Sequence, residues 1–117
     1  MSTDTGIDLV AYAPRSAQAR TIQIKTNLGP KPGKAALDWW IRASVPAQII
    51  ALVDLSTMKV WLLLKEELPT LAQQQPSGRF HLYMVLEATR KPHKTGKLLN
   101  MSDFDTYLIE TRAPDLF

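Results

Sequence analysis

Apolar and polar residues alternate along two stretches near the start of the chain, residues 6–12 and 20–26. A period of two is typical of β-strands that bury one face. The residues between the two stretches, Pro14–Gln18, have the composition of a turn. The pattern therefore predicts a β-hairpin in which Ile22 and Ile24 point to the apolar side.

The polar side of this hairpin carries a carboxylate, an amide and an ammonium group. Gln23 and Lys25 alternate with the isoleucines of the second strand, and Asp8 takes the equivalent place in the first. A turn centred on residues 16–17 would pair Asp8 with Lys25 and keep the two apolar faces together, whereas a slip of one residue would separate them. We therefore expect Asp8, Gln23 and Lys25 to lie close together on one surface of a sheet.

The rest of the chain reads as further strands and short helices, without an internal repeat. Asp54, at the end of an apolar run, is expected to form a turn. The expected elements are an extended or helical segment at 35–44, a buried central strand at 47–55, a strand at 59–64 paired with it, a short helix from Pro69, a strand at 80–88, and a helix at 102–112 that is capped by Ser102 and ended by Pro114.

The composition indicates one globular domain. The chain has 117 residues, 45% of them hydrophobic and 21% charged, and this length suits a single domain. It contains no Cys, which excludes disulfides and thiolate metal sites and leads us to expect a cytoplasmic protein. The first residues lack a signal pattern and the apolar runs are too short to span a membrane. The net charge of +3 permits nucleic-acid binding without requiring it.

The segment Gly6–Asp8 and, after a turn, the segment Ile22–Lys25 with its Gln-x-Lys motif resemble the PD-(D/E)XK restriction-endonuclease-like nuclease superfamily. The match is best to its Mrr-like variants, which have Gln in the second motif, and it extends over residues 6–64. The resemblance implies an α+β (α/β-like) fold, with a mixed central sheet opened by a β-hairpin and flanked by helices. It also implies a metal-dependent nuclease that hydrolyses phosphodiester bonds of DNA.

The resemblance also assigns roles to single residues. Asp8, Gln23 and Lys25 would be catalytic, and Lys25 would orient a water molecule or stabilise the phosphate. Asp8, Gln23 and the backbone carbonyl of Ile24 would bind Mg²⁺ or Mn²⁺. Members of the superfamily usually carry a helix before the first strand, and residues 1–5 leave no room for one. We therefore expect the domain to lack that helix, to be N-terminally incomplete, or to receive the helix from a partner.

A structural interpretation of the same residues stays open. Asp8 and Lys25 could form a cross-strand ion pair, which is worth roughly 0.2–1 kcal/mol on an exposed sheet. One carboxylate binds a divalent cation weakly, and no spacing selects Glu66, Glu67 or Glu87 as an additional ligand. The alternative function is a catalytically degenerate nuclease-fold module that binds nucleic acid or a protein partner.

Basic and aromatic residues offer further contacts. The neighbouring Trp39 and Trp40 could stack on bases, pack in the core or cover a homodimer interface, and packing is the more frequent role of such a pair. Two loops rich in Pro and Gly carry basic residues that could contact a nucleic-acid backbone, with ordinary solvated loops as the alternative. These candidate nucleic-acid contacts are Lys31, Lys34, Arg90, Lys91, Lys94 and Lys97.

Overall fold

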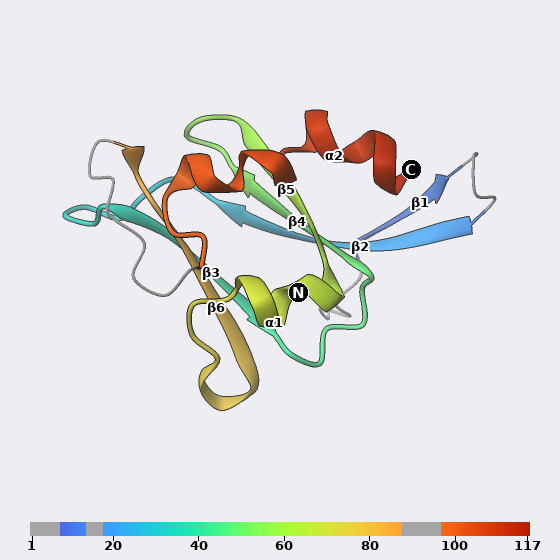
Figure 1. Ribbon diagram of the computed structural model, residues 1–117, viewed down its shortest axis with the longest axis horizontal. Helices are drawn as coiled ribbons and strands as arrows, with labels where there is room; N and C mark the ends of the chain where they lie inside the picture. The colour runs from blue at the N-terminus through green and yellow to red at the C-terminus, as the bar shows by residue number, and fades with distance from the viewer. Residues whose placement is uncertain (1–7, 14–17, 88–96) are drawn as a thin grey trace, which may run out of the picture.

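The computed structural model describes residues 8–13, 18–87 and 97–117, which form an α+β fold with a mixed β-sheet and a few short helices (Figure 1). None of the helices in these ranges is long and apolar enough to cross a membrane. The strands are β1 (Leu9–Ala13), β2 (Gln18–Asn27), β3 (Ala36–Arg42), β4 (Ile49–Asp54), β5 (Lys59–Leu64) and β6 (Arg79–Val85). The helices are α1 (Leu68–Leu71) and α2 (Ile109–Leu116), with 3₁₀ turns η1 (Lys65–Glu67), η2 (Pro76–Gly78) and η4 (Met101–Tyr107).

A four-stranded sheet in the order β1-β2-β4-β5 forms the centre of the fold. β1 and β2 are antiparallel and form the predicted hairpin, β2 and β4 are parallel, and β4 and β5 are again antiparallel. The prediction of a mixed sheet opened by a hairpin is therefore confirmed. Only the second half of β2 pairs with β4, and the hairpin consequently extends beyond the other strands (Figure 1).

The register of the hairpin differs from the predicted one by two residues. Leu9 pairs with Ile22, so the preceding residue, Asp8, comes opposite Gln23, two positions before its predicted partner. The predicted turn was centred one position too late, and residues 14–17 lie outside the described part of the chain. Because the difference is an even number of residues, the predicted alternation of faces is kept.

A second, two-stranded sheet consists of β3 and β6 in antiparallel pairing. The segment 35–44, which the sequence left open between helix and extended structure, is thus a strand. Leu37, Trp39 and Ile41 are buried, and the residues between them are exposed. β3 therefore has one core face and one outer face, as expected for a strand in a sheet that covers a core on one side.

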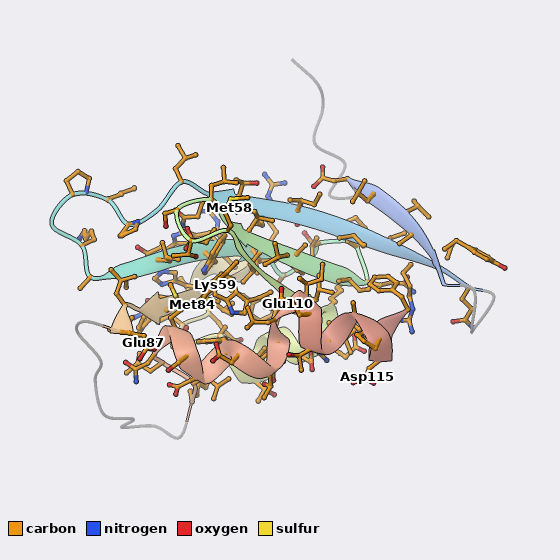
Figure 2. All side chains as sticks on the ribbon, turned by 90° about the horizontal axis from the view of Figure 1, so that it is seen from above. Met58, Lys59, Met84, Glu87, Glu110 and Asp115 are labelled. Atoms are coloured by element: carbon orange, nitrogen blue, oxygen red, sulfur yellow. The ribbon has the colours of Figure 1, made fainter. Side chains whose placement is uncertain are left out.

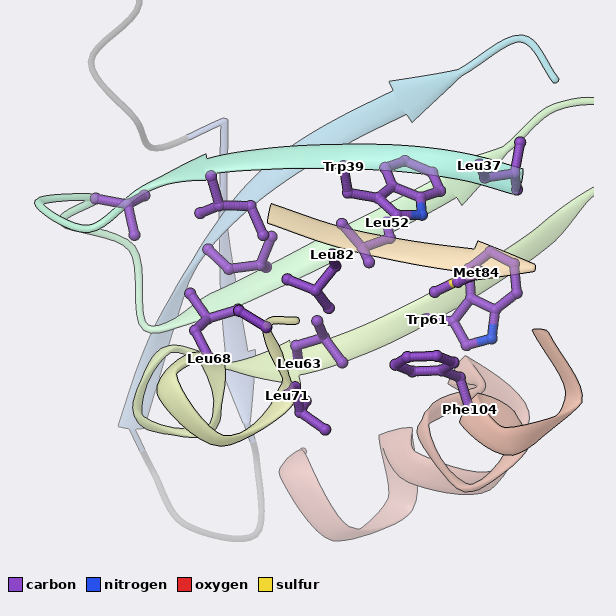
Figure 3. Packing of buried hydrophobic residues seen from close by; sticks show 14 of the residues in the cluster. Leu37, Trp39, Leu52, Trp61, Leu63, Leu68, Leu71, Leu82, Met84 and Phe104 are labelled. Carbon is purple, nitrogen blue, oxygen red and sulfur yellow. The ribbon is translucent and has the colours of Figure 1, made fainter. Parts of the chain in front are cut away.

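The two sheets pack face to face around the main core (Figure 3). Trp61 of β5 lies in this core, with its ring centroid 6.3 Å from that of Trp39 at an interplanar angle of 69°, an edge-to-face arrangement that aromatic pairs favour. Leu116 of α2 packs on the other face of the large sheet, together with Ile49 and Leu62. β4 is therefore covered on both faces, as its apolar pattern predicted.

The turn after β4 confirms the predicted role of Asp54, whose side chain is fully buried. The backbone N–H and hydroxyl of Ser56 donate to Asp54 Oδ1 over 3.0 and 2.7 Å, and the hydroxyl of Thr57 donates to Oδ2 over 2.6 Å. A buried carboxylate needs such partners because its desolvation is costly. Asp54 thus shapes the β4–β5 turn.

The helix predicted at 102–112 is instead two successive helical segments, which lie along the sheets (Figure 2). The first, η4, begins after Asn100 rather than at the predicted cap Ser102. The backbone N–H of Asn100 donates to Asp103 Oδ2 over 2.8 Å. The Asp103 carboxylate thus caps the start of η4 by accepting from an N–H group that has no partner inside the helix.

The second segment, α2, does not end at Pro114 as predicted but contains it. A proline ring removes one intrahelical hydrogen bond and crowds the preceding turn. Pro114 lies near the end of the helix, where the backbone N–H of Phe117 still donates to the carbonyl of Ala113 over 2.9 Å. Burial of Leu116 against the large sheet favours this continuation of the helix.

Candidate functional site

Asp8 lies immediately before β1 and contacts β2 through both backbone and side chain. Its backbone N–H donates to the carbonyl of Ile22 over 2.8 Å, and its carboxylate Oδ2 accepts a 2.7 Å hydrogen bond from the backbone N–H of Ile24. The carboxylate is exposed and occupies a place along β2 where a backbone carbonyl would otherwise act as acceptor. The acid of the first motif is thereby fixed against the strand that carries the second motif.

Gln23 and Lys25 follow on β2, with alternate residues on the same face. Gln23 is only 5% exposed and lies beside Ile50 of β4, whereas Lys25 is half-buried. Since N–H and C=O groups of one strand residue point to the same edge, the Ile24 carbonyl faces the edge at which the Asp8 carboxylate lies. The structure therefore brings the predicted site together beside residues 23–25 of β2: Asp8 lies next to this segment, and Gln23, Ile24 and Lys25 belong to it.

The ion pair between Asp8 and Lys25, which the sequence left open as an alternative, does not form within the described residues, where the acid–base contacts are those of Asp38 with His81 and of Glu67 with Arg112. The cause is the position of the Asp8 carboxylate, which accepts from the backbone of β2 instead. The charges of Asp8 and Lys25 therefore do not neutralise each other.

Two of the additional acids considered from the sequence, Glu67 and Glu87, have partners away from this site. Glu67 binds Arg112 of α2 through both carboxylate oxygens, and Glu87 accepts a 2.7 Å hydrogen bond from the backbone N–H of Ser102. Within residues 8–13, 18–87 and 97–117, no three His, Cys, Asp or Glu side chains gather as a metal cluster. Asp8 is the carboxylate that the register of the hairpin and its contact with the Ile24 N–H bring to this part of β2.

The loop between β2 and β3 carries Lys31 and Lys34, both exposed. Near its start lies Gly29, whose φ of +131° is a conformation that residues with a Cβ rarely adopt. The backbone N–H of Gly29 donates to Asn27 Oδ1 over 3.1 Å, and Ser56 approaches so closely that a Cβ at position 29 would lie 3.1 Å from it. The loop therefore leaves the end of β2 in a fixed direction, with its ammonium groups open to solvent.

The second basic segment is only partly described. Arg90, Lys91 and Lys94 lie outside the described residues. Lys97 is half-buried, and its ammonium group donates to the carbonyl of Ala72, next to α1. The described part of this segment therefore has a structural contact of its own.

The adjacent tryptophans have different environments. Trp39 is 2% exposed and belongs to the core, while Trp40 is 44% exposed on the outer face of β3. Opposite Trp40 on β6 lies His81, and the two rings stack with centroids 4.0 Å apart. The alternation of apolar and polar residues along 36–42 could have separated the two tryptophans if the segment had been taken as a strand.

A second charged cluster joins the C-terminal helix to the sheet. Arg112 donates to both carboxylate oxygens of Glu67 and, over 3.0 Å, to the carbonyl of Leu62. Its guanidinium group also lies 4.8 Å from the ring centroid of Tyr107. Burial, and then the nearby Glu67 carboxylate, raise the pKa of Tyr107 above its ordinary value of 10.0, against the opposing effect of Arg112. We call Glu67, Tyr107 and Arg112 the anchoring cluster.

Comparisons with protein-family models, with curated proteins and with solved structures found no match to this chain.

Proposed function

We propose that this domain is a metal-dependent nuclease, restriction-endonuclease-like in fold, that hydrolyses phosphodiester bonds of DNA. The observation that carries the proposal is the fixed position of Asp8, whose carboxylate lies 2.7 Å from the backbone N–H of Ile24, between Gln23 and Lys25 of the Gln-x-Lys motif. The mixed sheet opened by the hairpin that bears both motifs supports the same interpretation.

The donor atoms along β2 fit a hard divalent cation. Mg²⁺ and Mn²⁺ prefer oxygen ligands, and Mg²⁺ usually keeps several waters in its shell. The Asp8 carboxylate supplies the negative charge, the Ile24 carbonyl faces the same edge of β2, and the Gln23 side chain offers an amide oxygen. A bound cation of this kind supplies a nucleophilic water and neutralises charge on the phosphate.

Lys25 is suited to act on the phosphate. It is half-buried beside β4 and forms no ion pair with another described residue. An ammonium group in a partly dehydrated position stabilises developing negative charge better than one in free solution. Lys25 therefore stabilises the pentavalent phosphate, and the exposed Lys31 and Lys34 hold the neighbouring nucleic-acid backbone.

The second candidate is a nuclease-fold module that binds nucleic acid or a protein without cleaving it. It is favoured by the single carboxylate at the site and by the absence of a metal cluster among the described residues. It shares the nucleic-acid contacts of the first candidate but predicts no divalent-metal dependence. The two candidates are therefore separated by cleavage and not by binding.

The first experiment incubates the protein with linear, branched and single-stranded DNA in Mg²⁺ or Mn²⁺. We expect cleavage that falls about 100-fold or more in Asp8→Ala and in Lys25→Ala, because each removes a charge that acts on the reacting phosphate. Asp105→Ala and Lys59→Ala remove the same charges elsewhere and serve as matched controls. Full cleavage by the Asp8 and Lys25 variants would refute the assignment, and no cleavage by the wild type would favour the binding module.

A gain-of-function variant sharpens the test. Gln23→Glu replaces the amide by a carboxylate of almost equal size, and added ligand charge strengthens binding of hard cations. We expect half-maximal cleavage at a lower Mg²⁺ concentration, with no such shift in the exposed control Gln75→Glu. An unchanged metal dependence in folded Gln23→Glu would show that residue 23 does not contact the cation.

A further inference from the structure

The outer face of the small sheet presents aromatic and cationic side chains in register. Three cross-strand pairs follow one another along β3 and β6, and their side chains alternate with those that enter the core. We call these six residues the aromatic face: Asp38 opposite Tyr83, Trp40 opposite His81, and Arg42 opposite Arg79.

The indole of Trp40 is held in a defined orientation although it is 44% exposed. Its ring lies nearly parallel to that of His81, with an interplanar angle of 4° and centroids 4.0 Å apart. His81 is fixed in turn, because its Nε2 lies 2.7 Å from Asp38 Oδ1 and its ring centroid lies 5.5 Å from that of Tyr83. A planar group can therefore stack on Trp40 without first ordering its side chain.

The charges at the end of this face are not compensated. Arg42 and Arg79 are exposed and directly opposite each other, and neither forms an ion pair with another described residue. Like charges in direct cross-strand pairs disfavour folding. The carboxylate of Asp38 contacts His81 and leaves the guanidinium groups available for an anion. A single guanidinium group can bind a phosphate through two parallel hydrogen bonds.

We propose that the aromatic face binds single-stranded nucleic acid, with a base stacked on Trp40 and backbone phosphate held by Arg42 and Arg79. Trp40 and Arg42 are two residues apart on one face of β3, which is about 7 Å. A stacked base and a bound phosphate at this separation belong to one short oligonucleotide. An aromatic platform beside cationic groups is how proteins hold single strands without reading their sequence.

The aromatic face adjoins the candidate nuclease site. The side-chain amide of Asn27, at the end of β2, donates to the carbonyl of Asp38 in β3 over 3.1 Å. Lys25 is two residues before Asn27 and Trp40 two residues after Asp38, so each lies about 7 Å along its strand from this hydrogen bond. Unpaired nucleotides on Trp40 would thus lead toward β2, although binding itself does not depend on hydrolysis at Asp8.

The test measures binding of a fluorescein-labelled oligo(dT) of about 12 nucleotides by fluorescence anisotropy, with EDTA present so that hydrolysis plays no part. We expect Trp40→Ala to weaken binding about tenfold or more and Trp40→Phe to retain most of it. The matched control is Tyr12→Ala, which removes a 65% exposed aromatic side chain from β1. An abasic strand of the same length should bind wild type about as weakly as oligo(dT) binds Trp40→Ala.

The arginines have a separate readout. Each charge removed in Arg42→Gln and Arg79→Gln should lower the slope of log affinity against log salt by about 0.7, the value for one phosphate contact on a single strand. Lys59→Gln on the large sheet is the charge control. An unchanged slope in the double variant would remove the arginines from the interface.

Tryptophan fluorescence supplies an independent check of where the strand binds. Trp39 and Trp61 are 2% and 0% exposed, so quenching by iodide reports Trp40 alone. Oligo(dT) should protect the wild type from iodide. Equal affinity of folded Trp40→Ala and the wild type for oligo(dT), or no binding of oligo(dT), would overturn the proposal.

Asp8→Ala separates this proposal from the nuclease function. It should bind oligo(dT) like the wild type while losing cleavage. If Asp8-dependent cleavage is found but binding is insensitive to Trp40, the nuclease function stands and the aromatic face is not its binding surface. If binding depends on Trp40 and no cleavage occurs, the aromatic face stands alone.

Discussion

Charged side chains have different partners in the anchoring cluster and in the candidate site. In the first, Arg112 donates to both oxygens of Glu67 and to a backbone carbonyl, so opposite charges neutralise each other at a helix–sheet contact. In the second, Asp8 and Lys25 lie near each other along β2 without forming an ion pair. The difference suggests that the first pair stabilises the fold and that the second retains its charges for a ligand.

The largest effect on stability is expected at Arg112. Arg112→Met keeps the length of the side chain but leaves the Glu67 carboxylate without its partner between η1 and α2. Removing one partner of a fully buried pair costs about 3–5 kcal/mol, and because this pair is partly exposed we expect a loss of about 2–3 kcal/mol. Urea unfolding followed by circular dichroism measures it.

The control for that variant is Arg42→Met, which removes an exposed arginine that has no ion pair among the described residues. It should change the free energy of unfolding by no more than about 0.5 kcal/mol. If Arg112→Met were equally mild, the anchoring cluster would not stabilise the fold and the comparison would fail.

A smaller effect on stability is expected at the candidate site. Asp8→Asn keeps an acceptor for the Ile24 N–H, and Lys25→Met keeps the aliphatic part of a half-buried side chain. Each should lower the free energy of unfolding by less than about 1 kcal/mol while greatly reducing cleavage. A loss at Lys25→Met as large as that at Arg112→Met would show that Lys25 serves the fold rather than a substrate.

The sequence predicted the large sheet well because its signals are local. Alternation along β2 and the apolar run of β4 each follow from which faces are buried, and Asp54 sits next to the turn that it shapes. The hairpin register was two residues off because the position of the turn depends on a short connection rather than on hydrophobic pattern.

The small sheet and the C-terminal segment were harder to predict because their determinants are distant in sequence. Paired residues of β3 and β6 are at least 37 positions apart in the sequence, the smallest separation being that of Arg42 and Arg79. This pairing decides that Trp39 is buried while Trp40 is not. Pro114 is a helix breaker by local rules, yet Leu116 packs on the large sheet and α2 continues. Tertiary contacts overrode local propensity at both places.

The relative positions of the candidate residues on the strands were predictable in part, but their contacts were not. Alternation along the strands correctly associated Asp8, Gln23 and Lys25 with neighbouring positions. The contact between the Asp8 carboxylate and the Ile24 N–H could not be predicted, since it arises where the β1–β2 ladder ends. The stacking of Trp40 on His81 likewise required the pairing of β3 with β6.

The smallest expected effect is the pH dependence contributed by Tyr107. Its pKa is raised by burial and then by the Glu67 carboxylate, so the folded state holds the phenolic proton more tightly than the unfolded state. Below the unfolded pKa of about 10 both states are protonated and the contribution to stability is constant. As the pH rises from there through the folded pKa, the unfolded state loses its proton first and stability falls.

As the pH rises above about 10, we therefore expect the free energy of unfolding of the wild type to fall more steeply than that of Tyr107→Phe, which lacks the titrating group. Tyr12→Phe controls for loss of an exposed phenol. Parallel curves for wild type and Tyr107→Phe would mean that the anchoring cluster does not act on the phenol. A steeper fall in the free energy of unfolding for the wild type and Tyr12→Phe than for Tyr107→Phe would support the comparison. It would show that the groups of the anchoring cluster act on one another and on the stability of the fold, in contrast to the charges of the candidate site.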